Sequence, residues 1–157
     1  MNNKEVSDMI LSDASRLVQA IETGAAWELW LQVELQILFR QTKGVSVGRE
    51  IPFPAPYASQ SLDFLLGVGA ASFAIELKVE SATNAGNALM TSLATDIAKI
   101  VNFKLDLGVA LSRWVIAIGY SSVARASLAG ITKKLPTGAT AAIYNETQSI
   151  GVLIVTV

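Results

Sequence analysis

The sequence contains no cysteine and no histidine. Their absence excludes disulfides, thiol catalysis, zinc-finger sites, imidazole bases and Ser-His-Asp triads together. Any bound metal must therefore be held by oxygen ligands, which favours Mg, Mn or Ca over Zn.

Charged residues are also scarce. They make up 16% of the chain, while 52% of the residues are hydrophobic and the mean hydropathy is +0.46; roughly 25% charged is usual for a soluble domain. Either a partner subunit covers apolar surface or the protein lies in a membrane. The longest uncharged apolar stretch in the middle of the chain, residues 64–75, is far shorter than the roughly 20 residues of a spanning helix and contains two glycines. We therefore expect no membrane span, and a homodimer or larger homo-oligomer.

The sequence shows no excess of basic residues and no evident signal peptide. Its net charge is −1 and its pI is about 5.4, which argues against a wide basic face for nucleic acid and leaves room for a small one. The opening stretch "MNNKEVSDMILSDASRL" has acids among its apolar positions and no hydrophobic signal core. We expect a cytoplasmic protein, and a length of 157 residues favours one domain over residues 1–157.

Apolar periodicity and turn residues predict an α/β fold. Three prolines mark residues 52–59 as a loop, "GVG" at 67–69 is the expected hairpin turn, and Asn84 or Asn87 is expected to cap the helix that follows. The expected helices are 5–22, 25–41, 88–106 and 122–135, and the expected strands are 45–51, 61–67, 71–80, 113–120, 140–144 and 150–157. This order, ααβββαβαββ, predicts a central mixed β-sheet flanked by helices.

Three charged residues interrupt the apolar stretch "SLDFLLGVGAASFAIELKVES" at 61–81. Alternation along the strand places Glu76 and Lys78 on the same face, roughly 6–7 Å apart. If the two strands form a hairpin, Asp63 lies near the level of Glu76. Two carboxylates and an ammonium then converge, which suits an oxygen-ligated divalent cation. The lysine could orient or deprotonate a water, or stabilise developing negative charge.

A fourth acid, Glu34, lies on the apolar side of the helix expected at 25–41. A buried acid needs a partner, which the metal cluster or an arginine such as Arg40 or Arg49 would supply. Glu80, at the end of its strand, reads as a solvated charge. The alternative for the whole pattern is an exposed strand edge with solvated side chains.

The order of Glu34, Asp63, "ELK" at 76–78 and a following helix resembles the PD-(D/E)xK nuclease superfamily, over about residues 25–120. The resemblance implies a restriction-endonuclease-like core and a Mg- or Mn-dependent nuclease that hydrolyses phosphodiester bonds in DNA. It also implies that Asp63, Glu76 and Glu34 ligate the metal, that Lys78 is catalytic, and that Lys99, in "TDIAKI" at 95–100, contacts phosphate. For Lys99 a surface ion pair with Asp96 is the alternative.

Two other functional interpretations remain open. The chain could be a catalytically inactive nuclease fold used as a binding or assembly module, for instance in a defence or toxin–immunity system. The acidic pI and the apolar composition favour that interpretation, and the intact set of candidate site residues argues against it. A structural oligomer without a site is the third interpretation.

Overall fold

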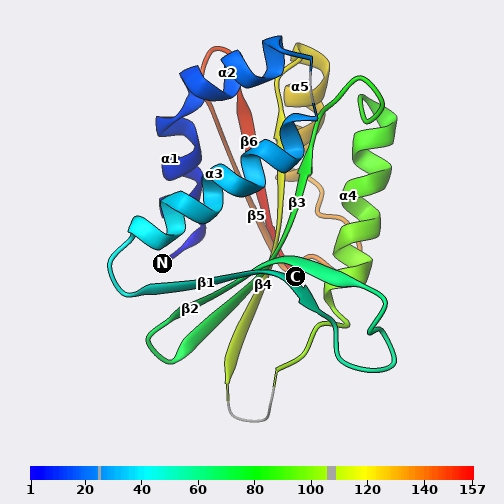
Figure 1. The fold of residues 1–157 in the computed structure, drawn as a ribbon. Helices are drawn as coiled ribbons and strands as arrows, with labels where there is room; N and C mark the ends of the chain where they lie inside the picture. The colour runs from blue at the N-terminus through cyan, green and yellow to red at the C-terminus, as the bar shows by residue number, and fades with distance from the viewer. Residues whose placement is uncertain (25, 106–108) are drawn as a thin grey trace.

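A six-stranded β-sheet forms the centre of the computed structural model, which describes residues 1–24, 26–105 and 109–157 (Figure 1). The strand order across the sheet is β1-β2-β3-β4-β6-β5. β3 and β4 run parallel, and the other neighbouring pairs run antiparallel, which confirms the expected α/β class and mixed sheet. The strands are β1 (Val45–Pro52), β2 (Ser61–Val68), β3 (Ala71–Val79), β4 (Ala110–Gly119), β5 (Ala141–Glu146) and β6 (Gly151–Thr156).

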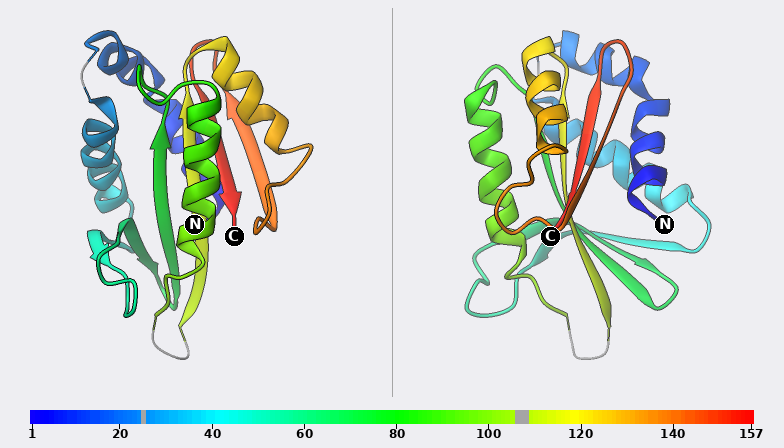
Figure 2. Two further views of the ribbon diagram at one scale, coloured as in Figure 1. Left: turned by 90° about the vertical axis from the view of Figure 1, so that its right-hand side faces the viewer. Right: turned by 180° about the vertical axis from the view of Figure 1, so that it is seen from behind.

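Helices cover both faces of this sheet (Figure 2). One face carries α1 (Asn3–Ser12), α2 (Ala14–Glu22) and α3 (Trp27–Gln41), and the other carries α4 (Asn87–Ile100) and α5 (Ser122–Ile131). β3 shows how the sequence sorts its side chains between the two layers. Phe73, Ile75, Leu77 and Val79 pack with the first layer, whereas Ala74 packs with the second, so the alternation predicted for this strand is confirmed.

The first predicted helix is wrong in one respect, because residues 5–22 form two helices. Asn2 begins α1 with a capping box that includes Glu5. At Asp13 the backbone leaves the helical region, with φ −101° and ψ 16°, and α2 starts at the next residue. A short polar residue such as aspartate favours a helix boundary over a helix interior. The break lets both short helices bury their apolar residues, Ile10 and Leu17 among them, against the same sheet.

The other differences lie at element ends. The helix predicted at 88–106 ends at Ile100, the helix predicted at 122–135 ends at Ile131, and β4 begins three residues earlier than expected. Residues 25 and 106, the predicted limits of two helices, lie outside the described residues.

Two loops also differ from expectation. The β2–β3 turn is the two-residue connection Gly69–Ala70 rather than 67–69, with φ +60° at Gly69. Neither predicted asparagine caps α4, since the N-cap position is Gly86 without a side-chain cap. Asn84 instead joins β3 to α4: its Nδ2 donates to the Val79 carbonyl and its Oδ1 accepts from Ser92 Oγ, each at 2.9 Å.

Within the described ranges, none of the helices combines the length and the apolar character that crossing a bilayer requires.

Candidate active site

The candidate site begins where β2 separates from β3. The ladder between these strands runs from the Val68–Ala71 pair to the Phe64–Ile75 pair. At the next level, Asp63 Oδ2 accepts a hydrogen bond from the backbone N–H of Leu77 at 2.7 Å. A side chain thus replaces the strand as the partner of a backbone donor that would otherwise be left unpaired. The register confirms that Asp63 lies at the level of Glu76.

The neighbouring edge strand is distorted at the same level. Arg49 of β1 pairs with Phe64 and Ile51 pairs with Leu62, so Glu50 stands opposite Asp63. Glu50 has φ +53°, a left-handed conformation that is uncommon for residues other than glycine. Regular sheet structure therefore gives way around Asp63, and side chains from both helical layers can reach β3. Figure 1 shows this part of β3 running between α3 and α4.

A chain of hydrogen bonds orients the Asp63 carboxylate. Gln32 Nε2, from α3, donates to Asp63 Oδ1 at 3.0 Å, and Arg49 Nη2 donates to Gln32 Oε1 at 2.7 Å. Burial raises the pKa of Asp63, while the Leu77 N–H, Lys99 and Lys78 oppose that increase. Gln32 was not singled out from the sequence. Its position four residues after Glu28, on the same helical face, is the signal that could have indicated it.

Glu76 has the most strongly shifted pKa among the acids near the point where β2 separates from β3. It is 3% exposed, and burial raises its pKa to about 8, with the charges of Asp63 and Asp96 adding to the shift and Lys99 opposing it. Lys99 Nζ lies 2.9 Å from both carboxylate oxygens but donates a hydrogen bond to Oε2. Oε1 is buried and has no hydrogen-bond partner among the described residues. The structure therefore leaves a buried carboxylate only partly satisfied.

Lys78 lies between two acids from opposite layers. Its Nζ is 3.4 Å from Asp96 Oδ2 on α4 and 3.8 Å from Glu28 Oε1 on α3. Burial lowers the pKa of Lys78, but the charges of Asp96 and Glu28 more than offset this effect, and the resulting pKa is raised. Lys78 is thus held as an ammonium, which can orient a water or stabilise negative charge. It is poorly suited to removing a proton.

The surface ion pair with Asp96, the alternative considered for Lys99, is not formed, and Lys99 pairs with Glu76 instead. Besides Glu76, its ammonium donates to the Ser61 carbonyl at 2.9 Å and lies 5.5 Å from the centre of the Phe53 ring. Asp96 is buried and belongs to the cluster through Lys78. The sequence spacing of three correctly put both residues on one side of α4. It could not show that this side faces β3.

Glu34 is not with the other predicted site residues. It is buried, as expected, and its carboxylate pairs with Arg16 of α2. Gln32 faces Asp63. Residues two apart on a helix point about 200° apart, so Glu34 points away from Asp63. The alternative of an arginine partner is correct, although the arginine is neither Arg40 nor Arg49. Glu28 is the α3 acid that reaches the cluster.

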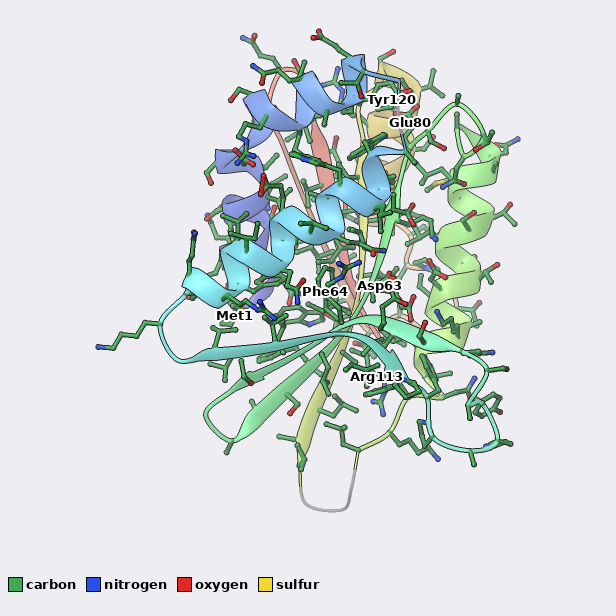
Figure 3. The ribbon with its side chains drawn as sticks, viewed as in Figure 1. Met1, Asp63, Phe64, Glu80, Arg113 and Tyr120 are labelled. Atoms are coloured by element: carbon green, nitrogen blue, oxygen red, sulfur yellow. The ribbon has the colours of Figure 1, made fainter. Side chains whose placement is uncertain are left out.

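Glu80 was wrongly expected to be a solvated charge. It is 3% exposed, and its carboxylate accepts hydrogen bonds from Tyr120 N and Ser121 N at 2.8 Å and from Ser121 Oγ. These donors belong to the two residues directly before α5, of which Ser121 is the N-cap, a position whose backbone N–H has no partner inside the helix. Figure 3 shows Glu80 and Tyr120 together, apart from Asp63.

The cluster contains the carboxylates of Asp63, Glu76, Asp96 and Glu28 and the ammonium groups of Lys78 and Lys99. Among the described residues, no three acids are grouped closely enough to hold a metal ion by themselves. Mg²⁺ usually binds proteins through one or two carboxylates and keeps several waters. The unsatisfied Oε1 of Glu76 beside the Asp63 carboxylate fits that donor requirement.

Comparison of this chain with family models, with curated proteins and with solved structures finds no match.

Proposed function

We propose that this protein is a Mg- or Mn-dependent nuclease with a restriction-endonuclease-like core, hydrolysing phosphodiester bonds in DNA. One observation carries the proposal: where β2 leaves β3, the Asp63 carboxylate accepts a hydrogen bond from the backbone of Leu77, between Glu76 and Lys78, and its charge acts on both of these side chains. The surrounding elements support it, since α3 precedes the three-stranded meander and α4 follows it, the order that the superfamily resemblance implies.

Asp63 and Glu76 would hold the metal ion. When bound, such an ion supplies positive charge for the phosphate and makes a water more acidic. The Arg49–Gln32–Asp63 hydrogen bonds keep one of the two carboxylates in a fixed orientation. Glu34, paired with Arg16, has no part in this proposal.

The two lysines would act on the phosphate group. Lys78 remains charged at neutral pH because Asp96 and Glu28 flank it, so it would stabilise negative charge that develops during attack by water. Lys99, whose side chain is 24% exposed, would contact a phosphate oxygen of the substrate strand. Both groups lie in a partly buried site, where charges interact more strongly than in water.

The binding-module interpretation also has a specific observation in its favour. Each lysine already neutralises carboxylates, Lys99 on Glu76 and Lys78 on Asp96 and Glu28. A cluster that is neutralised by its own side chains can persist as a structural feature of a fold that no longer cleaves anything.

Cleavage assays separate the two interpretations. Plasmid and oligonucleotide substrates would be incubated with Mg or Mn at low salt, because an acidic protein gains little affinity from phosphate contacts. We expect Lys78→Ala to lower the cleavage rate by about 10²–10³, the usual effect of losing one preorganised charge-stabilising group. Lys134→Ala, at an exposed lysine far along the chain, is the matched control and should cleave like the wild type.

Two results would contradict the nuclease proposal. One is the absence of cleavage of DNA and RNA with both metals. The other is metal-dependent cleavage that Lys78→Ala and Lys134→Ala change equally. The first result favours the binding module.

A further inference from the structure

A partly enclosed hollow of about 350 Å³ opens beside the candidate site, at the end of β3. Trp27 and Tyr120 form its aromatic walls, and Val79 and neighbouring aliphatic residues extend them. The carboxylate of Glu28 and the hydroxyl-bearing residues Ser81 and Thr83 supply its polar lining. Cavities of this size at the carboxyl ends of parallel strands are common ligand sites in α/β proteins.

The aromatic walls are fixed in place. Trp27 Nε1 donates a hydrogen bond to the carbonyl of Glu80 at 2.8 Å, and the backbone N–H of Tyr120 donates to the carboxylate of the same residue at 2.8 Å. The two rings pack edge to face, with centroids 6.4 Å apart. A ligand therefore meets a preformed surface and does not have to order it.

Glu28 connects this hollow to the candidate site. It lines the hollow and also lies 3.8 Å from Lys78 Nζ. A strand whose phosphate reaches Lys78 would therefore bring a neighbouring nucleotide to the mouth of the hollow. A nucleobase suits the lining, because its face can stack on the partly exposed Tyr120 ring, against which the buried Trp27 packs. Its edge offers hydrogen-bonding groups to a carboxylate and hydroxyls.

We propose that this hollow binds one unpaired nucleobase of the substrate strand, next to the phosphate that is cleaved. This inference rests on the proposed nuclease function and specifies its substrate as single-stranded or locally unpaired nucleic acid. A base inside a duplex is stacked and paired, and can enter such a hollow only after it has been flipped out of the helix.

Binding of small ligands tests the proposal without any cleavage. Amide chemical shifts would be followed by NMR, without metal, during titration with deoxyadenosine monophosphate and with deoxyribose phosphate, which lacks the base. We expect the nucleotide to shift the amides of Ser81, Thr83 and Tyr120, and the sugar phosphate to leave them unchanged.

Two matched variants locate the binding in the hollow. Ala82 lines the hollow and is exposed, so Ala82→Leu would fill part of the space without disturbing the core and without adding a ring on which a base could stack. Ala85, exposed in the same loop, is not part of the lining, and Ala85→Leu is the control. Nucleotide affinity should fall about tenfold or more in the first variant, since base stacking on aromatic residues would be lost. It should stay unchanged in the second.

The inference is overturned if the nucleotide moves these amides no more than the sugar phosphate does. It is also overturned if Ala82→Leu binds the nucleotide as well as Ala85→Leu does. The binding test and the cleavage test can fail separately. Binding in the hollow without metal-dependent cleavage would defeat the hydrolytic function alone, and cleavage without binding would defeat the nucleobase pocket alone.

Discussion

Glu76, near the end of β3, and Glu80, directly after it, are equally buried but differ in the number of hydrogen-bond donors around their carboxylates. Each is 3% exposed. Glu80 accepts three hydrogen bonds from the start of α5. Glu76 has one ammonium partner, one oxygen that accepts no hydrogen bond from the described residues, and a pKa raised by burial to about 8. Burial of an acid therefore does not by itself indicate a functional site. The number of donors that surround the carboxylate distinguishes the structural acid from the candidate functional one.

The largest effect should come from removing the satisfied acid. Glu80→Ala leaves two partly buried N–H groups and a hydroxyl without their acceptor and removes a buried side chain, and we expect the free energy of unfolding to fall by about 3 kcal/mol. Chemical denaturation measures this value. Glu22→Ala, at an exposed acid, should stay within about 0.5 kcal/mol of the wild type. A loss for Glu80→Ala as small as that of the control would remove the distinction between the two glutamates.

The unsatisfied acid should behave in the opposite way. Glu76→Gln removes a buried charge while keeping the side chain's shape, and in metal-free protein at pH 8 it should raise the free energy of unfolding by about 2 kcal/mol. The same variant should abolish metal-dependent cleavage. Destabilisation of the metal-free protein would show that the ion pair with Lys99 outweighs the cost of burying the charge.

The pH dependence of stability sharpens this result. The pKa of Glu76 is raised from 4.5 to about 8 on folding, so between these values the folded protein binds more protons than the unfolded chain. The free energy of unfolding of metal-free protein should therefore fall as the pH rises through this window. Lys99, Asp63 and Asp96 face Glu76, and the raised pKa values of the two aspartates act in the same direction. Denaturation curves from pH 5 to pH 8.5 should show a shallower decline in Glu76→Gln.

Asp63 is an intermediate case, since its two oxygens each accept one hydrogen bond. Gln32→Met removes the side-chain donor and leaves Arg49 without its acceptor, which should cost about 1 kcal/mol of stability. Gln36→Met, one turn further along α3, is the control and should have little effect. If both variants cleave substrate at the wild-type rate, the Arg49–Gln32–Asp63 hydrogen bonds do not position the carboxylate for catalysis.

The smallest change in the free energy of unfolding should come from a substitution on the exposed face of α3 that changes the oligomeric state. Leu29, Val33 and Ile37 form an exposed apolar stripe along α3, with 61%, 43% and 44% of their surfaces accessible, and we expect it to lie in a homodimer interface. Light scattering should give twice the 16.6 kDa of one chain, and Val33→Glu should give the monomer mass with a stability change below about 0.5 kcal/mol. A wild-type monomer at all concentrations would contradict the expectation.

Local patterns in the sequence predicted most of the secondary structure and the β2–β3 part of the site. Alternating apolar residues identified β3, and hairpin pairing placed Asp63 opposite Glu76. The ladder that fixes this register is formed by residues close together in the chain, so short-range reasoning was sufficient there.

The helical contributions could not be predicted in the same way. Which face of α3 or α4 meets β3 depends on the rotation of each helix against the sheet, and a helix that is apolar over most of its circumference does not determine this. Glu34 was chosen for that reason, whereas Glu28 and Gln32 reach the cluster. Glu80 was misjudged because its donors belong to residues 120 and 121, about forty positions later.

The hydrogen bonds that orient Asp63 start on β1, which is an edge strand of the sheet. A slip of an edge strand by one residue moves every side chain to the opposite face. Such a slip would carry Arg49 away from Gln32, so the amide that donates to Asp63 Oδ1 would lose its own partner, while the Leu77 N–H would still hold Oδ2. The register of β1 therefore controls how firmly the Asp63 carboxylate is oriented: a chain with β1 out of register should keep the rest of its sheet while holding this carboxylate less rigidly.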